Sequence, residues 1–213
     1  MSEAANRRPL KSRSSGWARA LAAALARTAI TPNQISVASV VFAAAGAAAL
    51  AASGAPWALL TCAACVQLRL LCNLLDGMVA VEGGKGSPVG ALYNEIPDRI
   101  ADAALLVAAG YAVHLAWLGW CAALLALTTA YLRALGGALG WPQDFRGPMA
   151  KPQRMAVLTL ACVLGAAEAA LRHSDYALRA ALWVIAVGAL ITCLRRTRAL
   201  AARARDAAAA LKS

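Results

Sequence analysis

Long apolar stretches alternate with short polar breaks along most of the chain. Six stretches approach the roughly 20 apolar residues that a helix needs to cross a hydrocarbon core of about 30 Å. They cover residues 35–53, 57–75, 100–117, 118–139, 155–171 and 176–194. Turn and interface residues form the breaks at 53–56, 119–120, 140–142 and 172–175. The pattern predicts an all-α integral membrane protein with six transmembrane helices.

A shorter amphipathic pattern precedes the first span. Trp17, Leu21 and Leu25 recur at helical spacing within residues 16–29, and basic side chains lie off this stripe. We expect a short amphipathic surface helix attracted to anionic lipid, although a plain basic anchor fits the same pattern. The predicted organisation is a basic cytoplasmic segment (1–34), a six-helix catalytic domain (35–194) and a basic cytoplasmic tail (195–213).

The composition is typical of a helical membrane protein, and the positions of the Lys and Arg residues account for the high net charge. Hydrophobic residues make up 61% of the 213 residues, aromatic residues 6% and charged residues 15%, which excludes a disordered chain. The net charge is +11, and most Lys and Arg residues lie in the two terminal segments and in alternate connections. This distribution predicts cytoplasmic termini by the positive-inside rule and favours membrane topology over nucleic-acid binding. The six Cys residues, all within or beside apolar spans, form no zinc-binding set.

The acidic residues are few and concentrated. Half of the ten lie between residues 76 and 102, and ionisable groups near membrane depth are expensive and commonly functional. Asn73 and Asp76 share one helix face, and Asn94 and Asp98 share another. Two consecutive antiparallel helices bring both pairs to the cytoplasmic end. Their oxygen ligands suit Mg²⁺ or Mn²⁺, while capped helix ends with a solvated loop are the alternative.

At these residues the sequence resembles the CDP-alcohol phosphatidyltransferase family. The family motif is D-x-x-D-G-x-x-A-R, then eight residues, then G-x-x-x-D-x-x-x-D. Here residues 73–81 read N-L-L-D-G-M-V-A-V, and eight residues separate them from Gly90. The resemblance spans about residues 16–200 and includes the T-P-N-Q-I-S run at 31–36. The positions that match the motif by type are Asp76, Gly77, Ala80, Gly90 and Asp98.

The departures from the motif reduce the charge of the expected site. Asn73 and Asn94 stand at two of the four acidic positions, and Val81 stands at the Arg position. The family pattern holds two divalent ions, so we expect weaker binding here, with one ion lost or bound only with substrate. A one-turn slip would give Asp98 and Asp102 the roles of residues 94 and 98, but the Gly90 spacing argues against it.

The resemblance implies attack of an alcohol on the β-phosphate of a CDP-lipid, with release of CMP. Asp98 is the expected general base. Mg²⁺ or Mn²⁺ would neutralise the diphosphate. The family also implies a homodimer, with its active site on the cytoplasmic side of a bacterial inner membrane. The implied metal ligands are Asn73, Asp76, Asn94 and Asp98, and the implied nucleotide-pocket residues are Gly77, Ala80 and Gly90.

Basic residues outside the motif are candidates for acceptor binding. Arg133 lies within the fourth predicted span, and Lys151 and Arg154 precede the fifth. They could bind the phosphate of a phosphorylated polyol, or Lys151 and Arg154 could simply anchor a loop. The main hypothesis is phosphatidyl transfer from CDP-diacylglycerol to an alcohol. Alternatives are the opposite polarity with a CDP-alcohol donor, a weakened CDP-lipid-binding homologue, and, less favoured, a small transporter.

Overall fold

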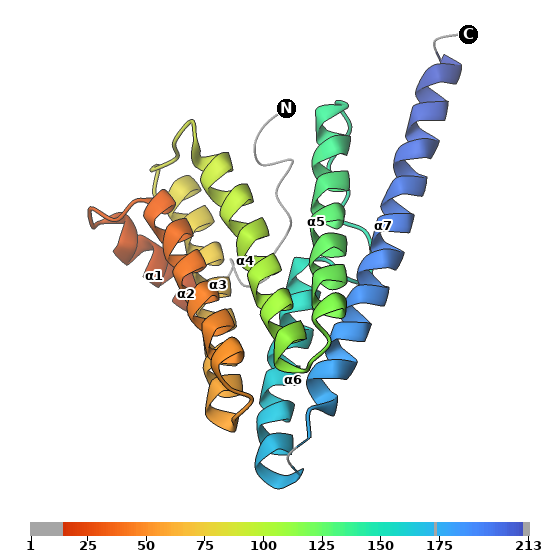
Figure 1. Cartoon of the computed structure of the whole chain (residues 1–213). Coiled ribbons are helices and arrows are strands. Elements are labelled where there is room, and N and C mark those ends of the chain that lie inside the picture. Colours follow the sequence, from red (N-terminus) through yellow and green to blue (C-terminus); the bar gives the residue numbers. More distant parts are fainter. Residues whose placement is uncertain (1–14, 173, 211–213) are drawn as a thin grey trace.

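The computed structural model describes residues 15–172 and 174–210, and this part is helical without strands. The first fourteen residues of the predicted basic segment, His173 in a predicted break, and residues 211–213 of the predicted tail lie outside the described residues. Figure 1 shows the arrangement of the helices. Their bounds are α1 Gly16–Ala26, α2 Pro32–Ala52, α3 Pro56–Val81, α4 Gly90–Ala112, α5 Ala116–Ala138, α6 Lys151–Arg172 and α7 Tyr176–Ala210.

Five of these helices, α2, α3, α5, α6 and α7, are long and apolar enough to cross a membrane. This result confirms the all-α class and supports a membrane protein. The remaining long helix, α4, has 23 residues. It carries four charged residues between positions 95 and 102, which sets it apart from the five apolar helices.

The six long helices pack in a closed ring. Around the ring, α2 contacts α3, α3 contacts α6, and α6 contacts α7; α7 contacts α5, α5 contacts α4, and α4 returns to α2. The core within the ring is rich in Ala and Leu side chains contributed by all six helices. Because small side chains allow close helix approach without a large aromatic core, an Ala-rich sequence forms this bundle.

The short helix α1 forms where the amphipathic pattern predicts it. Figure 1 shows it on the outside of the bundle, beside α2 and α3. Its packed face consists of Ala18 and Ala22, which contact a cluster that includes Leu75 and Met78 of α3. Trp17 is 57% exposed and Leu21 38% exposed. The larger apolar side chains are therefore mostly left uncovered by the protein.

The turn between α4 and α5 corrects one expected boundary. The hydropathy pattern places the break at residues 119–120, but α4 ends at Ala112 and α5 begins at Ala116. Gly119 lies inside α5 because two helices cross there: a Cβ at this position would lie 2.8 Å from the Leu106 carbonyl oxygen and 2.9 Å from the Gly110 Cα. Gly119 therefore serves close packing, and His114, with φ of 55°, lies in the turn.

Two connections, 82–89 and 139–150, lie at one end of the bundle, where α3 and α5 end and α4 and α6 begin. The connection 82–89 is tied to the start of α2. Lys85 Nζ donates to the carbonyl oxygens of Thr28 and Ile30, and Asn33 donates to Ser87 at 3.4 Å. The two halves of the motif, on α3 and α4, therefore lie at the same end of the bundle on either side of α2.

Candidate functional site

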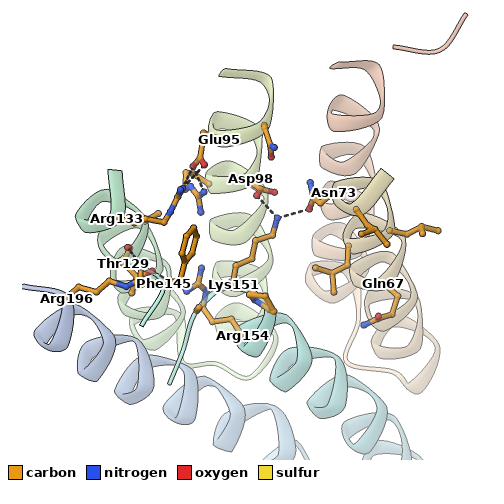
Figure 2. Close-up of a pocket in the computed structure, with 18 of the residues that line it drawn as sticks. Gln67, Asn73, Glu95, Asp98, Thr129, Arg133, Phe145, Lys151, Arg154 and Arg196 are labelled. Atoms are coloured by element: carbon orange, nitrogen blue, oxygen red, sulfur yellow. Dashed lines mark hydrogen bonds and ion pairs between the residues drawn. The ribbon is translucent and has the colours of Figure 1, made fainter. Parts of the chain in front are cut away.

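A cavity of about 530 Å³ lies at this end of the bundle. It is open to the outside and receives side chains from every helix except α2. Figure 2 shows its polar side chains converging from α3, α4, α5, α6 and α7. The polar and charged residues that line it are Gln67, Asn73, Asn94, Glu95, Asp98, Arg99, Thr129, Arg133, Lys151, Arg154 and Arg196.

A buried ion network joins three helices beneath the cavity. Arg69 of α3 lies 2.6 Å from Asp102 Oδ1 and 3.2 Å from Asp98 Oδ1, both on α4. Arg154 of α6 contacts the other oxygen of Asp102 at 2.7 Å. All four side chains are buried. Because both oxygens of Asp102 are bound by guanidinium groups, this residue holds α3, α4 and α6 together, and the arrangement gives no support to the one-turn slip.

Lys151 connects the two halves of the motif. Its ammonium donates to Asn73 Oδ1 at 2.7 Å and forms an ion pair with Asp98 Oδ2. Figure 2 shows the Lys151 side chain rising from α6 into the space between Asp98 and Asn73. Asp98, the expected base, is thus bound by positive groups at both oxygens. Its sequence neighbour Arg99 instead pairs with Glu95 at 2.6 Å.

Asp76 lies on the side of α3 that faces α2. It is 3% exposed, and Ser36 of α2 donates a hydrogen bond to its Oδ2 at 2.6 Å. The backbone amide of Gly77 adds a smaller favourable interaction with the carboxylate. The second oxygen, Oδ1, is buried without a hydrogen-bond partner among the described residues. An unpaired buried carboxylate oxygen is costly, which makes Asp76 a fitting ligand for a cation.

The other expected metal ligands offer less charge. Asn73 is half-buried, and Asn94 is exposed in the first turn of α4. Within residues 15–172 and 174–210, no group of three or more His, Cys, Asp or Glu side chains is arranged to hold a metal ion. The residues therefore fit a cation centred on Asp76, with amide oxygens as further ligands, better than a site formed by several carboxylates.

A basic wall lies across the cavity from Asn73. Glu95 bonds the Arg133 guanidinium through both carboxylate oxygens at 2.6 Å. Arg133 also donates to Gln143 and stacks 5.9 Å from the centroid of the Phe145 ring. Glu95 is half exposed, so an incoming anion can replace it on Arg133 with little rearrangement of the fold.

The 139–150 connection holds Phe145 in this position. Asp144 accepts hydrogen bonds from the Arg146 backbone amide at 2.9 Å and from its guanidinium at 2.8–3.1 Å. These bonds to Arg146 hold the pKa of the Asp144 carboxyl below its usual range. The hydrogen bonds between Asp144 and Arg146 hold the backbone on both sides of Phe145, whose ring lies against Arg133.

Arg196 of α7 completes the basic wall. Its guanidinium donates to the carbonyl oxygens of Thr129 and Arg146, and it is 4% exposed. The hydropathy pattern places this residue in the tail, whereas α7 continues unbroken to Ala210 and carries it into the cavity. Helical periodicity could have indicated this position from the sequence, because Gly188, Thr192 and Arg196 recur every four residues on one buried face of α7.

The structure brings most of the predicted site residues together. Asn73, Asn94, Asp98, Arg133, Lys151 and Arg154 all line the cavity. Asp76, Gly77, Ala80 and Gly90 do not line it; the first three lie on the last turns of α3, and Gly90 begins α4. Two charged residues outside the predicted site have structural partners. Arg69 holds the two aspartates of α4. Glu168 accepts the backbone amides of Tyr176 and Ala177 at 2.9 Å and so caps α7.

Comparison with known proteins identifies the family. No family model matches the chain. A phosphatidylinositol phosphate synthase of Mycobacterium marinum is 30% identical over 186 residues, which cover 83% of this chain and 76% of that protein. The chain belongs to the CDP-alcohol phosphatidyltransferase family. As a family member it is a transferase of phospholipid biosynthesis, which confirms the enzyme class expected from the sequence.

Two further relatives extend the comparison for this transferase. The bifunctional IPC transferase and DIPP synthase of Rubrobacter xylanophilus is 39% identical over 150 residues, or 68% of this chain and 34% of that protein. The structure of the Mycobacterium tuberculosis phosphatidylinositol phosphate synthase in complex with manganese and citrate has a TM-score of 0.74 and 25% identity. That match covers 86% of this chain and 88% of the other.

Proposed function

We propose that this transferase moves a phosphatidyl group from CDP-diacylglycerol to a hydroxyl of a phosphorylated polyol and releases CMP. The observation that carries the proposal is the pairing of two features in one cavity. Asp98 and Lys151 lie on one side, a basic wall of Arg133 and Arg196 lies on the other, and Arg154 lines the floor between them. Guanidinium groups bind phosphate well because their donors match its oxygens. Relatives named phosphatidylinositol phosphate synthases support an acceptor that already carries phosphate.

The reacting groups follow from this arrangement. The acceptor phosphate binds the basic wall, where it takes the place of Glu95 on Arg133, and this positions the acceptor hydroxyl toward Asp98. As the hydroxyl oxygen attacks the β-phosphorus of the CDP-lipid, the Asp98 carboxylate accepts its proton. The bond from the β-phosphorus to the bridging oxygen breaks, and CMP leaves with that oxygen. Lys151 stays close to Asp98 and stabilises negative charge on the phosphates.

A divalent cation, Mg²⁺ or Mn²⁺, supplies charge neutralisation of the diphosphate when bound. The residues proposed to hold it are Asp76, Asn73, Asn94 and Asp98. The relative whose structure contains manganese supports a divalent metal without distinguishing the two ions. Gly77, Ala80 and Gly90 are proposed to line the nucleotide pocket, because small residues at the facing ends of α3 and α4 allow close backbone approach.

The proposed setting is a bacterial inner membrane with both termini and the site on the cytoplasmic side. In this arrangement α4 is the sixth spanning helix and buries Asp98 and Asp102 against Arg69 and Arg154 inside the ring. The segment 1–34 lies on the cytoplasmic surface, 35–194 forms the catalytic domain, 195–213 forms the basic tail, and two copies form a homodimer. The predominance of Lys and Arg at the termini and in alternate connections supports this orientation.

The test is CMP release by the protein in nanodiscs that contain CDP-diacylglycerol and Mn²⁺. Matched acceptor pairs are inositol phosphate against inositol, and glycerol phosphate against glycerol. We expect CMP with at least one phosphorylated polyol and little with its unphosphorylated partner. Arg133→Gln should raise the KM for the acceptor, whereas Arg179→Gln, at the opposite end of α7 from the cavity-lining Arg196, serves as the control.

The second candidate is a weakened homologue that binds CDP-lipid without turnover. The observation that favours it is the occupation of both Asp98 oxygens by Arg69 and Lys151, together with Asn73 and Asn94 at acidic positions of the motif. CDP-diacylglycerol binding without CMP release for any acceptor would select this candidate and overturn the first.

A further inference from the structure

Lys151 occupies a position where the family pattern calls for a metal ion. Its ammonium lies between Asn73 of α3 and Asp98 of α4 and bonds both. These two residues stand at the first and last acidic positions of the motif. A positive group is therefore already bound by one residue from each half of the expected metal site (Figure 2).

The two remaining carboxylates of the motif differ in their surroundings. Both oxygens of Asp98 are bound by positive side chains, Oδ1 by Arg69 at 3.2 Å and Oδ2 by Lys151. Asp76 feels the charge of Lys151 only from a distance, as its weakest interaction, and its buried Oδ1 has no hydrogen-bond partner in the described part of the chain. Like charges repel strongly at short range in a site shielded from water. A divalent ion is therefore disfavoured beside Asp98 and favoured beside Asp76.

The charge of the ligand set leads to the same conclusion. Two divalent ions carry four positive charges, which the four acidic positions of the family pattern balance. Asn73 and Asn94 remove two of these negative charges, so the two remaining carboxylates, Asp76 and Asp98, are too few to balance two divalent ions. Lys151 then contributes a single positive charge, which requires fewer anionic ligands than a second ion.

We propose that this chain binds one divalent cation, at Asp76, and that the Lys151 ammonium takes the place of the second ion. The inference rests on the proposed function, because it concerns the site that would hold the diphosphate, and it narrows the proposed ligand set, since Asp98 binds Lys151 in place of the divalent ion. It assigns Lys151 a role distinct from the acceptor-binding wall: it is a fixed cation between α3 and α4. Asn73 and Asn94 fit the replacement of a divalent ion by an ammonium, because each lowers the negative charge of the site that the cation must balance.

The test counts bound Mn²⁺ without any turnover. Purified, substrate-free protein in nanodiscs is titrated with Mn²⁺, and unbound ion is read from its electron paramagnetic resonance signal. We expect one Mn²⁺ per chain in the wild type, loss of that ion in Asp76→Asn, and its retention in Asp98→Asn. Two ions in the wild type, no ion, or loss only in Asp98→Asn would overturn the proposal.

A variant that gains a second bound Mn²⁺ tests the role of Lys151 without the possibility that lost binding reflects misfolding. The triple variant Asn73→Asp, Asn94→Asp, Lys151→Met restores the acidic positions and removes the ammonium, so we expect two Mn²⁺ per chain. The matched control Asn73→Asp, Asn94→Asp keeps Lys151, and its second ion should bind at least tenfold more weakly than in the triple variant. A triple variant that still binds one ion, or equal affinities in the two variants, would overturn the role of Lys151.

The outcome is separable from that of the proposed function. One bound Mn²⁺ with no CMP release would leave the inference standing and overturn the enzymatic proposal. CMP release by a wild type that binds two Mn²⁺ ions would overturn the inference and leave the enzymatic proposal standing.

Discussion

Asp102→Asn should destabilise the bundle severely, because this carboxylate holds two buried arginines. Asp102 is 3% exposed, and its oxygens lie 2.6 Å from Arg69 and 2.7 Å from Arg154. Removing one partner of a buried ion pair leaves an uncompensated charge and costs about 3–5 kcal/mol. For a chain of this size, each kcal/mol shifts the Tm by about 2–4 °C. The apparent Tm should therefore fall by about 6–20 °C.

The assay is thermal unfolding of purified protein in one detergent, followed by intrinsic fluorescence and by loss of the monodisperse peak. Asp175→Asn is the matched control, because Asp175 pairs with Arg179 at 2.6 Å while both side chains are 37% exposed. We expect the control to unfold at the wild-type temperature, since exposed pairs contribute little. A Tm for Asp102→Asn within about 2 °C of the control would refute the assignment of Asp102 as the central structural anion.

Two further variants test the helix crossing and the basic wall. Gly119→Ala places a Cβ 2.8 Å from the Leu106 carbonyl oxygen, so it should destabilise the protein by about 1–3 kcal/mol in thermal unfolding. Gly54→Ala is the control and should not destabilise the protein, because a Cβ at this position has no atom within 4 Å. Equal Tm values for the two variants would contradict the close crossing. Arg196→Gln should raise the acceptor KM by roughly 10–100-fold through a lost charged hydrogen bond, with the CDP-diacylglycerol KM unchanged; a selective rise in the lipid KM would contradict this placement.

The sequence predicts the helices and the end of the bundle where the site lies, because both depend on local information. Apolar runs of nearly 20 residues define the long helices, and the spacing from Asn73 to Asp98 places polar groups on facing helix ends. Helix boundaries were less predictable where tertiary packing decides them. Gly119 reads as a turn residue in isolation and becomes a packing residue only when Gly110 lies against it.

The partners of charged side chains lie beyond what the sequence alone reveals. Arg69 and Asp102 are 33 residues apart, and Arg154 is a further 52 residues along the chain. Which cation binds which carboxylate depends on the ring order of α3, α4 and α6, and hydropathy does not encode that order. A hydropathy profile places Arg196 in the tail because charge ends an apolar run, although its helical phase continues the buried face of α7.

Acceptor labelling tests the central proposal most directly. The protein in CDP-diacylglycerol nanodiscs with Mn²⁺ is given inositol phosphate radiolabelled in its phosphate, and both the lipid phase and CMP are quantified. Phosphatidyl transfer to a phosphorylated polyol predicts labelled lipid and CMP in equimolar amounts. It also predicts that the Asp98→Ala variant forms neither product. CMP formed while the label stays in the aqueous phase would contradict the proposed acceptor, and the absence of both products would contradict the proposed reaction.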